Sequence, residues 1–214
     1  DLDLISASYK EITPLPPDLL DKVKQVGAFN LVTDEKLPQD LEDFLNDDRP
    51  VVYFGFGSMT DPNPEKTTKI ILETIKKTKI KAIISKGWSG LGSNLLEDKD
   101  VKLIGSISHH LLFPRVSAII HHGGAGTTSA ASLSGVPQII IPHLMDQYYF
   151  GLKIYELNLS SKPISRKKLT SENLAQAITY VISNKRVKDS AKIMREKLLK
   201  VDSLDNAYNI IFNK

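Results

Sequence analysis

The sequence predicts a doubly wound α/β fold, in which helices cover both faces of a parallel, Rossmann-like sheet. Short apolar runs alternate with longer segments in which apolar residues recur at helical spacing. The short runs are apolar throughout, which is typical of parallel strands buried on both faces. Hydrophobic residues make up 41% and charged residues 25% of the 214 residues, which is the usual balance of a globular protein.

The alternation of strands and helices begins at residue 51. Apolar runs bounded by glycine, proline or polar residues predict strands at 51–56, 80–85, 101–104, 118–121 and 138–141. Helical spacing predicts helices that start after Asn63 and that span 111–116, 127–133, 146–157, 171–183, 187–199 and 204–212. Thr170 is a predicted helix cap, with Leu169 and Leu174 placed as a hydrophobic staple around it.

Residues 1–50 differ in character from the rest and are interpreted as a linker or lead-in segment. Pro14, Pro16 and Pro17 remove backbone donors and favour an extended chain. A short helix is predicted near 41–45, before Pro50. We therefore expect the folded, ligand-binding domain to span 51–214.

Composition excludes several classes of protein. The chain has no cysteine, which excludes disulfides, thiol nucleophiles and thiolate metal sites. It has no apolar run of the roughly 18 residues that a membrane span needs. Its first residues do not show the basic and apolar pattern of a signal peptide. These features predict a soluble, cytoplasmic domain.

The net charge of +3 conceals an uneven distribution of charge. Residues 1–50 carry 12 acidic and 5 basic side chains, whereas 162–200 carry 11 basic and 3 acidic ones. Such a basic stretch is usually a solvated helix surface, although it can also contact anionic lipid at the periphery of a membrane. Tyr180 is the single aromatic residue of 162–200, which does not provide a series of rings for stacking on bases, so nucleic acid is not a predicted partner.

A glycine-rich loop between a predicted strand and a predicted helix is the first candidate site. His121 and His122 lead into Gly123, Gly124 and Gly126, which allow sharp turns and a close approach to a ligand. A helix N-terminus offers free N–H groups to an anion, to which Thr127, Thr128 and His122 can add hydrogen bonds. The pattern is neither a Walker loop nor a dinucleotide fingerprint. Phosphate binding and a plain strand-to-helix turn with a threonine cap both remain open here.

All five histidines lie between His109 and His143. Adjacent residues of an extended segment point to opposite faces, so His121 and His122 do not readily share a metal ion. A metal site is not predicted, and His109 and His110 are interpreted as turn or surface residues. Asp146 and Gln147 follow the last predicted strand, where they either bind sugar hydroxyls or cap a helix.

Three motifs, taken together, resemble the donor-binding signature of family 1 glycosyltransferases with the GT-B fold. They run His121-His-Gly-Gly-Ala-Gly-Thr-Thr, Gly135-Val-Pro-Gln-Ile-Ile-Ile-Pro and Asp146-Gln-Tyr-Tyr-Phe. Gly55-Phe-Gly-Ser-Met, Lys86-Gly-Trp-Ser and His109-His-Leu-Leu-Phe-Pro resemble the sterol 3-β-glucosyltransferase branch, with bacterial antibiotic glycosyltransferases as near relatives. The resemblance covers about 51–200 and implies the C-terminal, nucleotide-sugar-binding half of such an enzyme.

The resemblance implies a role for each residue that matches the family's motifs. Gly57 and Ser58 would meet the donor phosphate, and His122 would bond the diphosphate. The helix N-terminus cradling that diphosphate would be formed by Gly124, Ala125, Gly126 and Thr127. The uracil edge would pair with the backbone of Ile107, the base would lie under the loop of Trp88, and glucose would bind Asp146 and Gln147.

The sequence departs from patterns within the family in two places. Ala130 occupies the position of a ribose-binding glutamate in the plant enzymes, although the sterol branch also tends to have a small residue there. His110 and Leu111 replace the tryptophan and aspartate that are common after His109 in the sterol branch. The second departure keeps open an antibiotic or other natural-product glycosyltransferase.

The resemblance implies an inverting, metal-independent transfer of glucose from UDP-glucose, with no cofactor, to a sterol or other lipophilic hydroxyl. The catalytic base and the acceptor pocket would belong to an N-terminal domain, supplied by a longer chain or by a separate subunit. This chain alone is therefore expected to be inactive.

Two competing functions fit the same half-fold. A nucleotide-sugar 2-epimerase would need an acid/base pair near the sugar, and the Asp146-Gln147 motif disfavours it. A non-catalytic nucleotide-sugar-binding subunit, active only with a partner, would share every donor-binding motif of the transferase.

Overall fold

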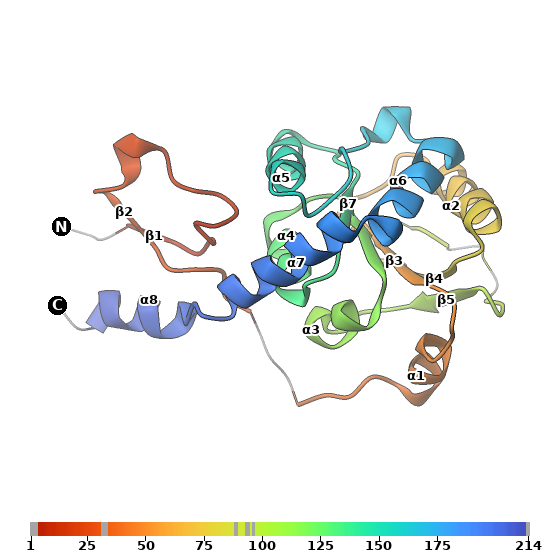
Figure 1. Cartoon of the computed structure of the whole chain (residues 1–214), viewed down its shortest axis with the longest axis horizontal. Coiled ribbons are helices and arrows are strands. Elements are labelled where there is room, and N and C mark those ends of the chain that lie inside the picture. The colour runs from red at the N-terminus through yellow and green to blue at the C-terminus, as the bar shows by residue number, and fades with distance from the viewer. Residues whose placement is uncertain (1–3, 31–33, 88–89, 93–94, 96, 213–214) are drawn as a thin grey trace.

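The computed structural model describes residues 4–30, 34–87, 90–92, 95 and 97–212. Its main sheet has five parallel strands in the order β5-β4-β3-β6-β7 (Figure 1). The bounds of these strands are β3 Val51–Gly55, β4 Lys81–Ser85, β5 Val101–Ile104, β6 Ala118–His121 and β7 Gln138–Ile140. The predicted parallel α/β sheet is confirmed, and each predicted strand is present to within one or two residues at its ends.

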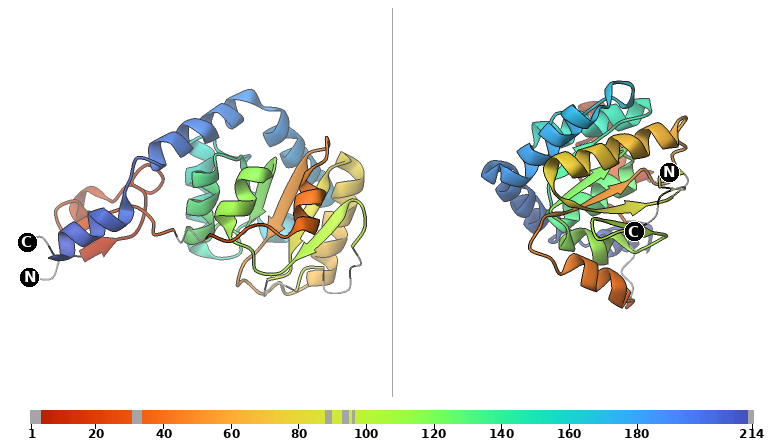
Figure 2. Two further views of the ribbon diagram at one scale, coloured as in Figure 1. Left: turned by 90° about the horizontal axis from the view of Figure 1, so that it is seen from below. Right: turned by 90° about the vertical axis from the view of Figure 1, so that its right-hand side faces the viewer.

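Helices cover both faces of this sheet, as Figure 2 shows. Their bounds are α1 Gln39–Leu45, α2 Pro64–Thr78, α3 His109–Leu112, α4 Ala125–Ser134, α5 Met145–Glu156, α6 Ser171–Ser183, α7 Lys185–Leu198 and α8 Ser203–Phe212. Short 3-10 turns lie at η1 Pro17–Leu19, η2 Phe113–Arg115 and η3 Arg166–Lys168.

The strands contribute alternate residues to two separate cores. Val52 and Phe54 of β3 pack with α2 and α6 on one face of the sheet. Val51 and Tyr53 pack with α1, α3 and α4 on the other. Because both faces are buried, the strands need no polar alternation, which is why their runs are apolar throughout.

Helix starts follow local capping chemistry where a side chain can cap. The Asn63 side chain accepts from the backbone N–H of Lys66 and so caps α2, whose predicted start after Asn63 is confirmed. The Thr170 hydroxyl accepts from the backbone N–H of Asn173 at 3.2 Å, so the predicted cap at Thr170 is confirmed. The predicted start of the helix at residue 127 is wrong, because α4 begins at Ala125 with Gly124 as its N-cap.

Residues 4–30 contain regular structure that the sequence did not predict. Strands β1 (Leu4–Ser6) and β2 (Val23–Gln25) form a parallel pair beside α8, away from the main sheet (Figures 1 and 2). Tyr9, Ile12 and Ala28 are buried in a cluster that includes α7 residues, so part of this segment packs on the domain.

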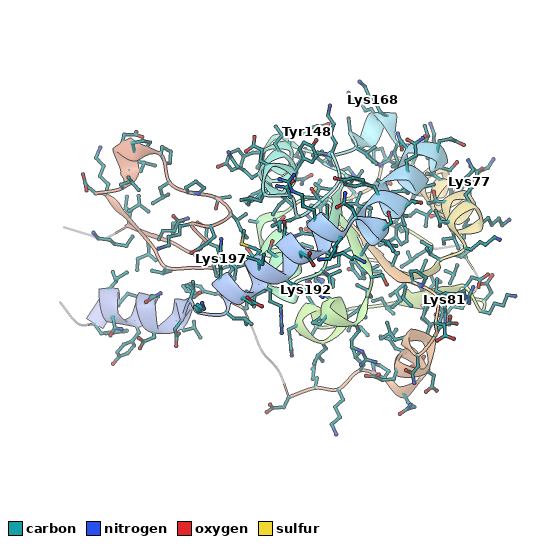
Figure 3. All side chains as sticks on the ribbon, in the orientation of Figure 1. Lys77, Lys81, Tyr148, Lys168, Lys192 and Lys197 are labelled. Atoms are coloured by element: carbon teal, nitrogen blue, oxygen red, sulfur yellow. The ribbon has the colours of Figure 1, made fainter. Side chains whose placement is uncertain are left out.

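The basic residues of 162–200 are spread over several elements. Lys168 projects from η3, whereas Lys192 and Lys197 project from α7 elsewhere on the surface (Figure 3). Within the described residues, no helix combines the length and the apolar character required to cross a bilayer. Contact with a membrane surface stays a prediction.

Candidate donor-binding site

The candidate site lies where the strand order of the sheet reverses. Strand β3 leads through α2 to β4 on one side, and β6 leads through α4 to β7 on the other, while β3 and β6 are direct neighbours. Loops after two such strands diverge and leave a crevice at the carboxyl edge of the sheet, where ligands of open α/β sheets bind. The loops here are 56–58 and 122–124, which hold four of the residues predicted for the site: Gly57, Ser58, His122 and Gly124.

The imidazole of His122 is held between two glycines. A Cβ added to Gly124 would lie 2.4 Å from His122 Nε2, and a Cβ added to Gly57 would lie 3.2 Å from Cε1. Gly57 also has a φ of +58°, which favours glycine. Both glycines are therefore required for the ring to occupy this position, and the structure brings the two predicted loops into contact.

His122 is buried and has an unused hydrogen-bonding atom. Its exposed fraction is 8%, and its Nδ1 has no hydrogen-bond partner among the described residues. Burial lowers the pKa of His122, and the nearby negative charge of Asp146 opposes this shift only in part. A buried polar atom without a partner costs free energy, which a hydrogen bond to this nitrogen would recover.

The N-terminus of α4 opens into the same crevice. Gly124 has no side chain with which to cap the helix, and the first helical hydrogen bond joins the N–H of Thr128 to the carbonyl of Gly124 at 2.9 Å. The N–H groups of Ala125, Gly126 and Thr127 thus precede the helical hydrogen-bond ladder. An added Cβ at Gly126 would meet no atom within 4 Å, so this first turn is open to an approaching anion.

The structure separates the roles of Asp146 and Gln147. The Gln147 side-chain oxygen accepts from the backbone N–H groups of His143 at 2.7 Å and Leu144 at 3.1 Å, so it caps the start of α5. The amide is buried, whereas Asp146 is exposed. Of the two predicted roles, the side-chain oxygen of Gln147 therefore has that of a helix cap. A sugar contact by Asp146 stays a prediction.

Two adjoining cavities extend from the crevice. One, of about 550 Å³, includes Gly57, Ser58 and Ile107 in its lining. The other, of about 530 Å³, includes Ile107, Gly126 and Ala130. Ile107 lines both cavities, so the two lie next to each other, one beside the loop after β3 and the other beside α4. Trp88 lies outside the described residues.

His109, interpreted from the sequence as a turn or surface residue, lines the candidate site. It lines both cavities, stacks on Phe113 with ring centroids 4.2 Å apart, and faces the edge of Tyr53 at 6.2 Å. Burial lowers the pKa of His109. Gly87, part of the Lys86-Gly-Trp-Ser motif, received no role from the sequence, yet an added Cβ there would lie 2.6 Å from the Gly57 carbonyl oxygen. Its place two residues beyond the predicted strand 80–85 was the available signal.

A largely buried polar cluster that the sequence did not predict lies between η3 and the start of α2. The Arg166 guanidinium donates to the Asp61 carboxylate and, at 2.5 Å, to the Thr67 hydroxyl, which joins η3 to the region before and within α2. Burial would raise the pKa of Asp61, but hydrogen bonds from Thr67, the Asn63 backbone and Arg166 outweigh it and lower the pKa. Asp61 and Arg166 are 105 residues apart, so local sequence carried no signal for this pair.

His143 lies near this cluster, with its ring edge-on to Phe56 at a centroid distance of 5.0 Å. Burial, together with the positive charges of Arg166 and His122, lowers the pKa of His143 to about 4. Burial likewise lowers the pKa of His121 to about 3. Among the described residues, no group of three or more histidine and carboxylate side chains is arranged to hold a metal ion.

We expect acid to destabilise the fold through these neutral histidines. An unfolded histidine has a pKa of about 6.5, so below pH 6.5 the unfolded chain binds protons that folded His121 and His143 do not. The free energy of unfolding therefore falls as the pH drops from 6.5 towards 4. At pH 5, fully buried His121 alone accounts for about 2 kcal/mol, and His143 for less because solvent screens it.

Urea unfolding at pH 7.5 and pH 5.0 measures this effect. The variant His143→Asn should lose less stability than the native sequence over the same interval, because one titrating group has been removed. Equal stability of the native chain at the two pH values would contradict the prediction.

The comparisons with known proteins agree with this geometry. The chain aligns in structure with spinosyn forosaminyltransferase SpnP, with a TM-score of 0.78 and 16% sequence identity. This alignment covers 97% of this chain and 53% of that chain. It also aligns with the calicheamicin glycosyltransferase CalG4, with a TM-score of 0.78 and 18% sequence identity. This alignment covers 98% of this chain and 51% of that chain. The fold is thus that of the C-terminal half of a GT-B glycosyltransferase.

Sequence comparison assigns the family. Residues 80–203 match the model described as Erythromycin biosynthesis protein CIII-like, C-terminal domain, and the chain belongs to this family of glycosyltransferase domains. It is 35% identical over 204 residues to sterol 3-beta-glucosyltransferase UGT80A2 of Arabidopsis thaliana, covering 94% of this chain and 32% of that protein. It is 33% identical over 190 residues to a sterol 3-beta-glucosyltransferase of Saccharomyces cerevisiae, covering 84% of this chain and 16% of that protein.

The chain therefore spans about a third or less of these curated relatives and about half of the solved structures. The family predicted from the sequence motifs is confirmed.

Proposed function

We propose that this domain binds UDP-glucose and presents it for an inverting, metal-independent transfer to the hydroxyl of a sterol or other lipophilic acceptor. The observation that carries the proposal is the buried His122 ring, held between Gly57 and Gly124 beside the uncapped start of α4. The names of the curated relatives support the sterol and glucose parts.

The diphosphate would lie against α4. N–H groups of Ala125, Gly126 and Thr127 and the partial positive charge of the helix N-terminus favour an anion there. His122 adds a hydrogen bond, and Ser58 is exposed across the crevice. When the acceptor oxygen attacks the anomeric carbon, negative charge collects on the leaving UDP, and these fixed donors stabilise it.

The nucleoside would occupy the two cavities that meet at Ile107. The small Ala130 side chain leaves room for the ribose in the second cavity, and His109 forms part of the wall. Asp146, exposed at the start of α5 and near enough to His122 to affect its pKa, would then bind glucose hydroxyls.

The acceptor pocket and the catalytic base would belong to a separate acceptor domain. In this proposal His122 is engaged by the diphosphate and Asp146 by the sugar, so neither is available to deprotonate the acceptor. The β1–β2 pair supports such a partner, because an isolated parallel two-stranded sheet is marginal in water and its edges favour further strands. Leu204, Tyr208 and Phe212 of α8 are also exposed beside it. Accordingly, 1–214 would bind the donor without transferring the sugar.

Titration calorimetry with UDP, uridine and UDP-glucose tests the proposal. We expect UDP to bind much more tightly than uridine, because the diphosphate makes the charged contacts. Equal affinities would remove the phosphate assignment of His122 and α4.

Replacing Asp146 by alanine is expected to weaken UDP-glucose and to leave UDP nearly unchanged, because UDP lacks the glucose hydroxyls. The loss should be about 1.5–3 kcal/mol, the usual contribution of a hydrogen bond to a charged group. The matched variant Gln147→Ala removes the oxygen that caps His143 and Leu144, so it should also lower thermal stability. A loss of UDP affinity in Asp146→Ala as large as that of UDP-glucose would exclude the sugar role.

A further inference from the structure

A chain of buried side chains supports the glycine loop from behind. His121, the last residue of β6, has no exposed surface, and its Nδ1 accepts the backbone N–H of Gly123 at 3.1 Å. Its Nε2 lies 2.9 Å from the side-chain oxygen of Gln138, the first residue of β7. The Gln138 amide nitrogen in turn donates to the hydroxyl of Ser132 in α4 at 3.0 Å. These three hydrogen bonds thus connect the glycine loop to β7 and then to α4, the helix that follows the loop.

The backbone N–H of Gly123 fixes the donor and the acceptor of every hydrogen bond in this series. A backbone N–H can only donate, so His121 Nδ1 must be the unprotonated nitrogen and Nε2 must carry the proton. Nε2 then donates to the Gln138 oxygen, which leaves the Gln138 amide nitrogen to donate to Ser132. Every polar group of the ring is satisfied, which a protonated imidazole would not allow.

The bond to His121 acts at the point where the loop changes direction. Gly123 has a φ of +93°, and an added Cβ would lie 2.8 Å from Ile140 and 3.1 Å from the Gln147 carbonyl oxygen. The next two peptides carry the loop into Gly124 and the first turn of α4. The orientation of the Gly123 peptide thus determines where His122 and the free N–H groups of α4 point.

We propose that His121 is the positioning residue of the diphosphate site, holding the Gly123 peptide so that His122 and the N-terminus of α4 converge on the crevice. The inference rests on the proposed donor-binding function. His121 does not touch the ligand: its ring has no exposed surface and bonds to Gly123 and Gln138, whereas the His122 ring lies between Gly57 and Gly124. The two rings are at 88° with their centroids 6.5 Å apart. The strongly lowered pKa of His121 agrees with a ring that stays neutral and keeps one tautomer.

Two substitutions separate the two hydrogen bonds of His121. Asparagine places its side-chain oxygen where Nδ1 lies, so His121→Asn retains an acceptor for the Gly123 N–H and loses the bond to Gln138. Glutamine reaches the position of Nε2, so His121→Gln retains the bond to Gln138 and leaves the Gly123 N–H unpaired. Each variant loses one buried hydrogen bond and is comparably perturbed in packing.

The expected result is that His121→Gln weakens UDP binding roughly tenfold or more, as a displaced charged contact would, while uridine binding changes little. His121→Asn should lose much less UDP affinity. Both affinities are measured by calorimetry well below the melting temperature of each variant. Equal losses in the two variants would mean that His121 acts only through general stability, and the proposal would be abandoned.

A measurement on the native chain covers the case in which a variant does not fold. Long-range ¹⁵N–¹H NMR spectra of the imidazoles should show His121 with an unprotonated Nδ1 and a protonated Nε2, unchanged from pH 8 to pH 5. A protonated Nδ1 would overturn the positioning role. Failure of the native chain to bind UDP would instead refute the proposed function, and this spectrum would still decide whether His121 holds the loop.

Discussion

Replacing His122 with alanine is expected to weaken UDP binding by about 1.5–3 kcal/mol, or roughly 10- to 150-fold, with little effect on uridine. The imidazole is buried between Gly57 and Gly124, and its Nδ1 has no partner among the described residues. Removing the imidazole takes away a preorganised donor for the diphosphate. It breaks no internal hydrogen bond of Nδ1, because Nδ1 makes none among the described residues. Calorimetry with the two ligands measures the difference.

The ratio between the ligands makes the test specific. A variant that disturbed the whole crevice would weaken uridine as well as UDP, whereas loss of a diphosphate contact affects UDP alone. A change of less than a few tenths of a kcal/mol in UDP binding would make His122 a structural residue of the turn.

The substitution Gly123→Ala is expected to destabilise the protein by about 2–4 kcal/mol and to abolish tight UDP binding. Its φ of +93° is unfavourable for alanine, and the new Cβ would meet Ile140 at 2.8 Å and the Gln147 carbonyl oxygen at 3.1 Å. Relief of these contacts requires the loop to move away from β7 and α5. Thermal or urea unfolding, together with UDP titration, measures both effects.

Gly126→Ala is the matched control three residues away. Its added Cβ has no atom within 4 Å, and the residue lies within α4, so stability should stay within about 0.5 kcal/mol of the native value. UDP should nevertheless bind more weakly, because the methyl group would project into the proposed diphosphate position. If Gly123→Ala were as stable as Gly126→Ala, the loop would be far more adaptable than its packing indicates.

The curated relatives and the structure support different parts of the proposed function. Sequence identity to sterol 3-beta-glucosyltransferases supports the sugar and the acceptor, whereas the crevice geometry supports binding of a diphosphate. The proposed transfer also depends on a separate acceptor domain, and the greater length of the relatives supports that part of the proposal.

Local sequence was sufficient for most of the main fold. The strands at 101–104 and 118–121 and the helix at 171–183 have their predicted bounds, because apolar periodicity and capping act between near neighbours. The sequence likewise placed the glycine-rich loop between a strand and a helix, which the structure confirms between β6 and α4. The β1–β2 pair was not predictable in the same way, because three-residue strands carry almost no periodic signal.

The sequence by itself determined that His121 and His122 point in opposite directions, since successive residues of an extended segment alternate. This alternation does not say which of them faces the crevice: the family motif implied His122, and the packing of separate elements gives the physical reason. Gln138 from β7 engages one ring, and Gly57 from the loop after β3 makes room for the other. Likewise, Arg166 meets Asp61 across 105 residues, and the Gln147 oxygen is taken by a helix start. Such contacts depend on how separate elements pack, which local propensity does not encode.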